Sequence, residues 1–81
     1  MNIVDIYMNN LRKDDVLNFA LKKDIILSNE ELDFTYDFIK KHYKEIMQDK
    51  YKYNFNDYEN RFSKENAEKI KKLISEYINY L

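Results

Sequence analysis

Apolar residues recur at spacings of three and four along residues 28–48, the longest regular pattern in the chain. This spacing places them on one stripe of a helix with 3.6 residues per turn. The stripe consists of Leu32, Tyr36, Ile39, Tyr43, Ile46 and Met47. Ser28 and Glu31 mark the start, because a serine hydroxyl accepts the backbone N–H of residue 31 while the Glu31 carboxylate accepts that of Ser28. The pattern therefore predicts a helix over residues 28–48.

Two further segments show helical periodicity. Residues 14–23 begin with two acids and end with two lysines, which suits the helix dipole. Their apolar face consists of Val16, Leu17, Ala20 and Leu21. Residues 63–79 open with Ser63 as N-cap and place Glu65 four residues before Lys69 on the polar face. We expect a helix over each segment.

The remaining segments connect these helices or precede them. Residues 1–10 contain an apolar run that fits either a short helix or a docking strand, and we favour the helix. Residues 25–27 form a short apolar connector into the Ser28 cap, in which Leu27 takes the position of a hydrophobic staple. Residues 49–62 are rich in Lys, Tyr, Asn and Asp, and predict the main loop.

Together these elements predict an all-α fold, a small bundle of three main helices with a short extra helix at the N-terminus. A chain of 81 residues is expected to form a single domain over residues 1–81. The predicted core consists of Leu17, Ala20, Leu32, Ile39, Tyr43, Ile46, Ile70, Ile74 and Ile78. At this size apolar burial only narrowly exceeds the conformational entropy lost on folding, so stability is expected to be modest.

The composition excludes several classes of site. The chain has no Gly, no Pro and no Cys. Phosphate-binding loops need glycine for close backbone approach, and disulfides, thiolate zinc sites and cysteine nucleophiles need cysteine. Without glycine, tight turns must rely on Asn, Asp and Lys.

The sequence shows no sign of a membrane segment or of secretion. No apolar run approaches the roughly 20 residues that span a bilayer. Residues 1–10 contain Asp5 and no Lys or Arg, and their apolar run is too short for a signal-peptide core. We therefore expect no membrane contact and a cytoplasmic location.

Two stretches, residues 11–32 and 61–77, combine an acidic helix start, a serine-capped helix entry and a serine-capped last helix. This combination resembles the small YqfT-like family of Bacillus-type Firmicutes, a domain of unknown function, over residues 11–80. The positions that carry the resemblance are Val16, Leu17, Phe19, Ala20, Ile25, Leu27, Ser28, Ser63, Ala67 and Leu73. Arg12 stands where the family tends to have a threonine N-cap. The family has no assigned activity, so the resemblance adds none.

Candidate chemistry is sparse. His42 is the single histidine, and with no cysteine it supplies at most one good metal ligand. The carboxylate pairs Asp14–Asp15 and Glu30–Glu31 fall in first helical turns, where the helix dipole accounts for them. We therefore expect a structural histidine, no catalytic residues, no metal site and no cofactor.

A lysine- and tyrosine-rich stretch over residues 40–53 supports an alternative function. Cations neutralise phosphates and aromatic rings stack on bases, which are the two parts of a single-strand nucleic-acid surface. The lysines concerned are Lys40, Lys41, Lys44, Lys50 and Lys52. Glu45 and Asp49 interrupt the run, and the net charge is −1. Nucleic-acid binding is therefore the second hypothesis.

The excess of aromatic residues supports the first hypothesis. Eight Tyr and five Phe exceed what a small core buries, and Tyr suits interfaces because it joins an apolar face to a polar tip. On the helical wheel Phe34 points away from the main stripe, and Phe38, Leu73 and Tyr80 lie at the rims of apolar faces. The sequence predicts an intracellular protein-interaction module, binding a second copy as a homodimer or another protein through this surface.

Overall fold

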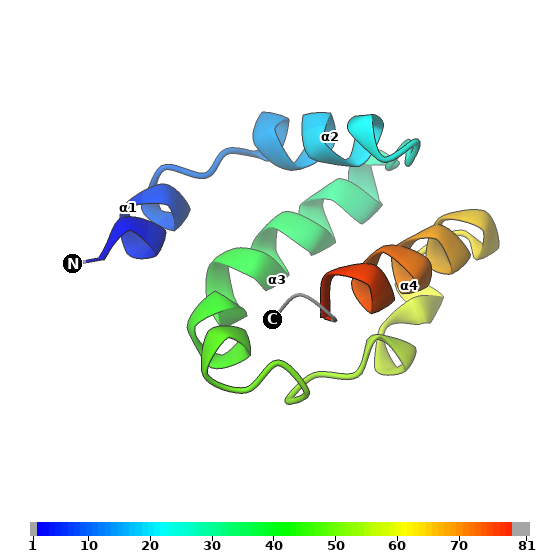
Figure 1. Cartoon of the computed structure of the whole chain (residues 1–81). Coiled ribbons are helices and arrows are strands. Elements are labelled where there is room, and N and C mark those ends of the chain that lie inside the picture. Colours follow the sequence, from blue (N-terminus) through cyan, green and yellow to red (C-terminus); the bar gives the residue numbers. More distant parts are fainter. Residues whose placement is uncertain (1, 79–81) are drawn as a thin grey trace. The chain divides into compact units, whose positions relative to one another are not determined.

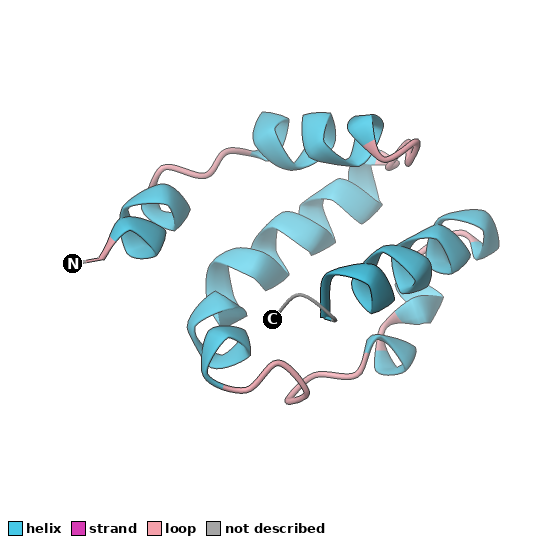
Figure 2. Ribbon diagram, in the orientation of Figure 1, coloured by secondary structure: helices cyan, strands magenta, loops and turns pink. Residues whose placement is uncertain are grey.

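The described residues, 2–78, form helices joined by turns in the computed structural model (Figure 1). The elements are α1 (Ile3–Asn9), α2 (Lys13–Lys22), α3 (Asn29–Gln48), α4 (Lys64–Ile78) and two short 3-10 helices, η1 (Phe55–Asp57) and η2 (Glu59–Arg61). Figure 2 shows helices and loops and no strand among these residues. The predicted all-α class is confirmed, together with the three main helices and the short N-terminal one. The last residue of the predicted 63–79 helix lies outside the described residues.

The chain divides into two compact units. Unit 1 spans residues 1–43 and contains α1, α2 and most of α3. Unit 2 spans residues 44–81 and contains the last residues of α3, the two 3-10 helices and α4. The single domain expected from the chain length stays a prediction.

The start of α3 follows the predicted capping box. The backbone N–H of Ser28 donates to the Glu31 carboxylate at 2.9 Å, and the N–H of Glu31 donates to the Ser28 hydroxyl at 3.1 Å. Two backbone donors that the helix cannot satisfy by itself are thereby paired. The Glu31 side chain is buried, and its negative charge lies at the positive end of the helix dipole.

The start of α4 is capped by Ser63. The Ser63 hydroxyl accepts the N–H of Asn66 at 3.1 Å, so the predicted N-cap is confirmed. The predicted pair of Glu65 and Lys69 is also present, with 3.5 Å between carboxylate and ammonium. In the preceding loop the Asn54 side chain accepts the N–H of Asn56 at 3.0 Å and begins η1. Asparagine thus forms a turn in a chain that has no glycine, as the composition predicts.

The connection from α2 to α3 turns at Asp24, which has a φ of 62°. The N–H of Asp24 donates to the Leu21 carbonyl at 3.0 Å, and the N–H of Ile25 donates to the Ala20 carbonyl at 2.8 Å. These two bonds form a Schellman motif, which usually has glycine at the left-handed position. Aspartate takes that position because it tolerates left-handed φ better than most residues. The motif turns the chain so that Ile25 is buried beside Ala20.

The buried hydrophobic side chains belong mostly to connectors and helix ends. Among the described residues they are Leu11, Val16, Ala20, Ile25, Leu27 and Ala67. Ala20 was a predicted core residue and is confirmed, whereas the prediction of Ile74 is wrong because its side chain is 37% exposed. The other predicted core residues are half-buried: Leu17, Leu32, Ile39, Tyr43, Ile46, Ile70 and Ile78. A chain this short has too high a surface-to-volume ratio to enclose them fully.

Candidate protein interface

A hydrogen bond from α3 holds the first turns of α1. The Tyr43 hydroxyl donates to the Asp5 carboxylate at 2.7 Å, although the two residues are 38 positions apart. The acceptor is charged, which makes this bond stronger than one between neutral groups. The hydrogen bond to Asp5 raises the pKa of the Tyr43 phenol above its ordinary value. Asp5 is the charged residue of α1, and its carboxylate accepts this hydrogen bond.

Two further side chains of α3 hold the end of α1 and the residues after it. The Lys40 ammonium donates to the Met8 carbonyl at 2.7 Å and to the Asn9 carbonyl at 3.4 Å. A cation at these carbonyls satisfies acceptors at the negative end of the helix dipole. The Tyr36 hydroxyl donates to the Leu11 carbonyl at 3.1 Å. We call Tyr36, Lys40 and Tyr43 the α1 tether, because they share one stripe of α3 and bind α1 and its connector through polar groups.

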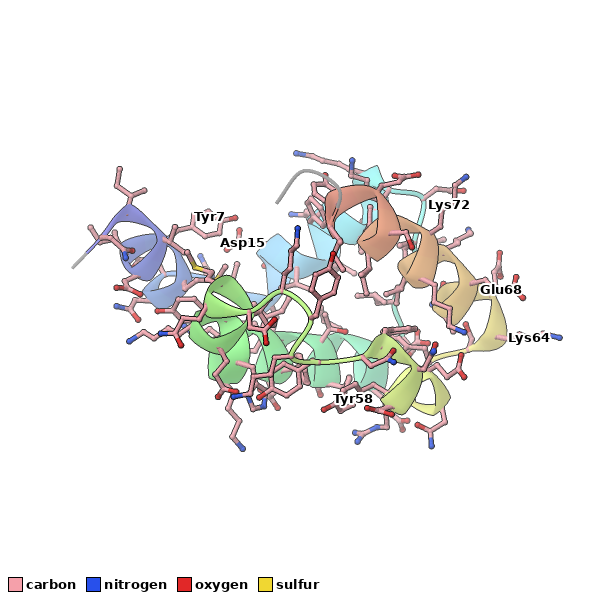
Figure 3. All side chains as sticks on the ribbon, turned by 60° about the horizontal axis from the view of Figure 1, so that its bottom comes forward. Tyr7, Asp15, Tyr58, Lys64, Glu68 and Lys72 are labelled. Carbon is pink, nitrogen blue, oxygen red and sulfur yellow. The ribbon has the colours of Figure 1, made fainter. Side chains whose placement is uncertain are left out.

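Three of the apolar side chains of α1 are exposed to solvent, whereas Val4 and Met8 are half-buried. None of its residues is buried, and Ile3, Ile6 and Tyr7 are 83%, 49% and 60% exposed. Ile6 and Tyr7 follow Ile3 by three and four positions, so all three residues lie on one side of the helix. In Figure 3 the Tyr7 side chain extends beyond the α1 ribbon. We call Ile3, Ile6 and Tyr7 the α1 face.

The interface residues predicted on α3 lie in a row of aromatic rings. The ring centroids of Phe34 and Phe38 are 5.9 Å apart, and those of Phe38 and His42 are 4.8 Å apart. All three side chains are half-buried, as is the predicted Leu73 on α4. The fourth predicted residue, Tyr80, lies outside the described residues. The interface at these positions stays a prediction.

His42 contributes its ring to this aromatic row. Within residues 2–78, no group of three or more His, Asp or Glu side chains is arranged to hold a metal ion. The tilt of 55° between the Phe38 and His42 rings is typical of packed aromatic pairs. The structural role predicted for His42 agrees with this contact.

Three of the five lysines in the nucleic-acid hypothesis make intramolecular contacts. Lys40 belongs to the α1 tether, Lys50 donates to the Ile78 carbonyl at 3.2 Å, and Lys52 pairs with Glu45 at 3.1 Å. Lys41 and Lys44 are exposed. Because phosphate binding by the first three would compete with these contacts, the structure offers fewer cations than the sequence suggested. Nucleic-acid binding stays a prediction.

A second exposed apolar set lies in unit 2. Its members are Met47, Tyr51, Ile74 and Tyr77. The Lys50 ammonium that reaches the Ile78 carbonyl also lies 5.4 Å from the centroid of the Tyr51 ring. This contact places Tyr51 near the end of α4, so the loop and the helix present apolar side chains at the same end of unit 2. One side of α4 is charged instead of apolar, and Figure 3 shows Lys64, Glu68 and Lys72 in a row along it.

The Tyr53 phenol in unit 2 has a pKa well above the ordinary value of tyrosine. Its hydroxyl donates to the Glu45 carboxylate, which also pairs with Lys52. The hydrogen bond to Glu45, assisted by desolvation, raises the pKa of Tyr53 to about 12. The cluster joins the end of α3 to the following loop, and it holds that loop as long as Tyr53 keeps its proton.

We expect Tyr53 to form its phenolate near pH 12. Folding favours the protonated phenol, so the stabilisation is complete below the ordinary tyrosine pKa of about 10 and is lost as pH rises toward the folded value. Ultraviolet titration of the phenolate band checks this. Tyr53→Phe should remove the step at highest pH, whereas Tyr51→Phe, at an exposed tyrosine, should leave that step in place. Disappearance of the same step from both variants would contradict the assignment.

The sequence contained a signal for the α1 face that the predicted interface did not include. Ile3, Tyr7 and Leu11 fit one helical stripe, but α1 ends at Asn9 and Leu11 is buried after it. The useful signal is that Asp5 is the only charged residue among residues 1–11. A nearly uncharged, apolar short helix attached to a highly charged chain is typical of a contact surface.

Comparison of the chain with protein-family models, with curated proteins and with solved structures found no match. The resemblance to the YqfT-like family therefore stays a prediction. Within the described residues, no helix combines the length and the apolar character needed to cross a bilayer.

Proposed function

We propose that this chain is a protein-interaction module without catalytic activity, that it acts in the cytoplasm, and that its simplest partner is a second copy. The support is the distribution of apolar side chains. Among the described residues, ten large hydrophobic side chains are exposed, whereas six hydrophobic side chains are buried. Scattered exposed apolar residues are normal on soluble proteins, so the argument depends on their clustering.

The observation that carries the proposal is the α1 face. Ile3, Ile6 and Tyr7 are adjacent on one helix and exposed, while the α1 tether occupies polar groups of that helix. A short helix usually gains its stability by burying its apolar side. Here hydrogen bonds and the half-burial of Val4 and Met8 hold α1, and Ile3, Ile6 and Tyr7 stay available to another molecule.

The surface predicted at Phe34, Phe38 and Leu73 receives less support than the α1 face. These side chains are half-buried, and the two phenylalanines already contact neighbouring rings. Nucleic-acid binding also receives less support, because Lys40, Lys50 and Lys52 are engaged within the chain. The exposed apolar side chains therefore favour a protein partner over nucleic acid, and they favour the α1 face over the surface at Phe34, Phe38 and Leu73.

The proposal is tested by light scattering coupled to size exclusion over a concentration series. The monomer has a mass of 10.0 kDa, and we expect the weight-average mass to rise toward twice that value with protein concentration. Raising the salt concentration should not lower the mass, because apolar contacts are not screened. A dimer with a dissociation constant of about 1 mM or below is detectable at about 1 mM protein. A mass that stays at the monomer value up to that concentration would contradict self-association.

A further inference from the structure

We propose that two copies of the chain associate by exchanging α1, so that α1 of each copy docks on α3 of the other. This inference rests on the self-association in the proposed function, and it names the segment that each copy gives to its partner. Exchange of an identical element is a low-cost route to a dimer, because contacts of the monomer are made again between two chains. The docking site consists of Lys40 and Tyr43, which already hold α1 within one chain.

Lys40 and Tyr43 recognise α1 in one orientation. The Lys40 ammonium binds the carbonyls of Met8 and Asn9, and the Tyr43 hydroxyl, three residues further along α3, binds the carboxylate of Asp5. The later donor on α3 thus meets the earlier acceptor, so α1 runs antiparallel to α3. The site fits a helix with a carboxylate in its first turn and accessible carbonyls at its last turn. The α1 helix of a second copy meets both conditions, because it has the same sequence.

The attachment of α1 allows it to leave its own chain. None of its residues is buried, and Val4 and Met8 are half-buried. Leu11, which follows in the connector, is buried, and its carbonyl accepts the Tyr36 hydroxyl at 3.1 Å. The connector is therefore anchored from Leu11 onward, and the exposed Asn10 is the hinge at which α1 can turn away. The hydrogen bonds that α1 gives up on leaving are the ones that it regains on α3 of the second copy.

The exchanged dimer needs no large new interface, because it contains the same contacts between α1 and α3 as the monomer. The connector decides between the two forms, since it keeps α1 close to its own α3. A short connector gives an effective concentration in the millimolar range. The exchanged dimer therefore becomes populated as the protein concentration approaches that range. We expect a dissociation constant of about 1 mM or somewhat below.

Nuclear magnetic resonance of mixed chains tests the α1 exchange in the unaltered protein. Isotope-labelled chains are mixed with an equal amount of unlabelled chains, at the highest concentration of the scattering series. The hydrogen bond of 2.7 Å from the Tyr43 hydroxyl to the Asp5 carboxylate brings the Tyr43 ring close to the Asp5 β-protons. An isotope-filtered spectrum reports only contacts between a labelled and an unlabelled chain. We expect it to contain a nuclear Overhauser effect between these two groups.

The contact of Tyr36 with Leu11 is the control in the same spectrum. It lies beyond the hinge at Asn10, so the α1 exchange leaves it within one chain. We expect the effect between the Tyr36 ring and Leu11 in the unfiltered spectrum and not in the filtered one. A filtered spectrum that contains both contacts would place the hinge elsewhere and overturn the assignment of Asn10.

Two changes in the connector provide a second test. Deletion of Asn10 shortens it by about 3.5 Å, so that α1 no longer reaches its own site in register and the site of a second copy becomes the alternative. Insertion of two glycines after Asn10 lengthens the connector at little entropic cost, so α1 stays on its own chain. We expect the deletion to lower the dissociation constant about tenfold or more and the insertion not to lower it. An unchanged constant in a deletion variant that keeps the helix content of the parent, measured by circular dichroism, would overturn the α1 exchange.

These measurements separate failure of the α1 exchange from failure of the proposed function. A parent chain that dimerises while the contact of Tyr43 with Asp5 stays within one chain would overturn the exchange and leave self-association standing. A parent chain that remains monomeric at every concentration would overturn both.

Discussion

Replacement of Ile25 with alanine is expected to lower the free energy of unfolding by about 2–4 kcal/mol. Ile25 is 2% exposed, and its N–H donates to the Ala20 carbonyl at 2.8 Å. The Schellman motif around Asp24 fixes the backbone on one side of Ile25, and buried Leu27 follows on the other. The surrounding residues therefore have little freedom to fill the cavity. In a domain of this length, such a decrease is a large share of the total stability.

The neighbouring Ile26 provides the matched control. Its side chain is 75% exposed, so Ile26→Ala is expected to change the free energy of unfolding by no more than about 0.5 kcal/mol. Urea denaturation followed by far-ultraviolet circular dichroism measures both variants. Similar destabilisation at both positions would contradict the burial of Ile25 and the exposure of Ile26 in this connector.

The starts of the helices were predictable because they depend on residues within one helical turn. Ser28 and Glu31 form the capping box through groups three positions apart, and Ser63 caps α4 over the same distance. Such contacts do not depend on where the rest of the chain lies. The all-α class follows from the same local patterns.

The core was less predictable because burial depends on the path of the chain. Leu11, Ile25 and Leu27 are buried although they lie between helices, where helical periodicity assigns no face. Ile74 lies at the centre of an apolar helical face and is nevertheless 37% exposed. A periodic pattern ranks the residues of one helix relative to each other, but it does not state how much partner surface is available.

The candidate interface likewise combines contacts that local sequence indicates with contacts that depend on the path of the chain. The side-chain contacts that attach α1 to α3 join residues 31 to 38 positions apart, and no local pattern indicates them. The row of Phe34, Phe38 and His42 could have been predicted from the sequence, because residues four positions apart on a helix have neighbouring side chains. On the helical wheel Phe34 lies opposite the main stripe, and that placement alone does not predict the row.

Removal of two α1 tether groups is expected to release α1 while the rest of unit 1 stays folded. The double variant Lys40→Met and Tyr43→Phe keeps the apolar parts of both side chains and removes the ammonium and the hydroxyl. Without these groups, the Met8 and Asn9 carbonyls and the Asp5 carboxylate no longer receive hydrogen bonds from α3. A seven-residue helix with no buried residue is not stable on its own.

Hydrogen exchange of the α1 amides measures this release. In the parent chain the N–H of Ile6 donates to the Asn2 carbonyl and the N–H of Asn10 to the Ile6 carbonyl, so both amides are protected when α1 is formed. We expect exchange at these amides to accelerate about tenfold or more in the double variant, since hydrogen bonds to charged groups are the strong ones. Amides of α2, to whose residues Lys40 and Tyr43 donate no hydrogen bond, should exchange as in the parent chain.

The control is the double variant Lys41→Met and Tyr51→Phe, which removes an ammonium and a hydroxyl from an exposed lysine and an exposed tyrosine. It should leave exchange in α1 unchanged, and equal acceleration in both double variants would rule out the tether as the cause. Removal of the tether should also weaken dimerisation, because the α1 face would then be ordered only on binding, at an entropic cost that the parent chain avoids. Tighter association of the tether variant would show that α1 covers the contact surface instead of forming it.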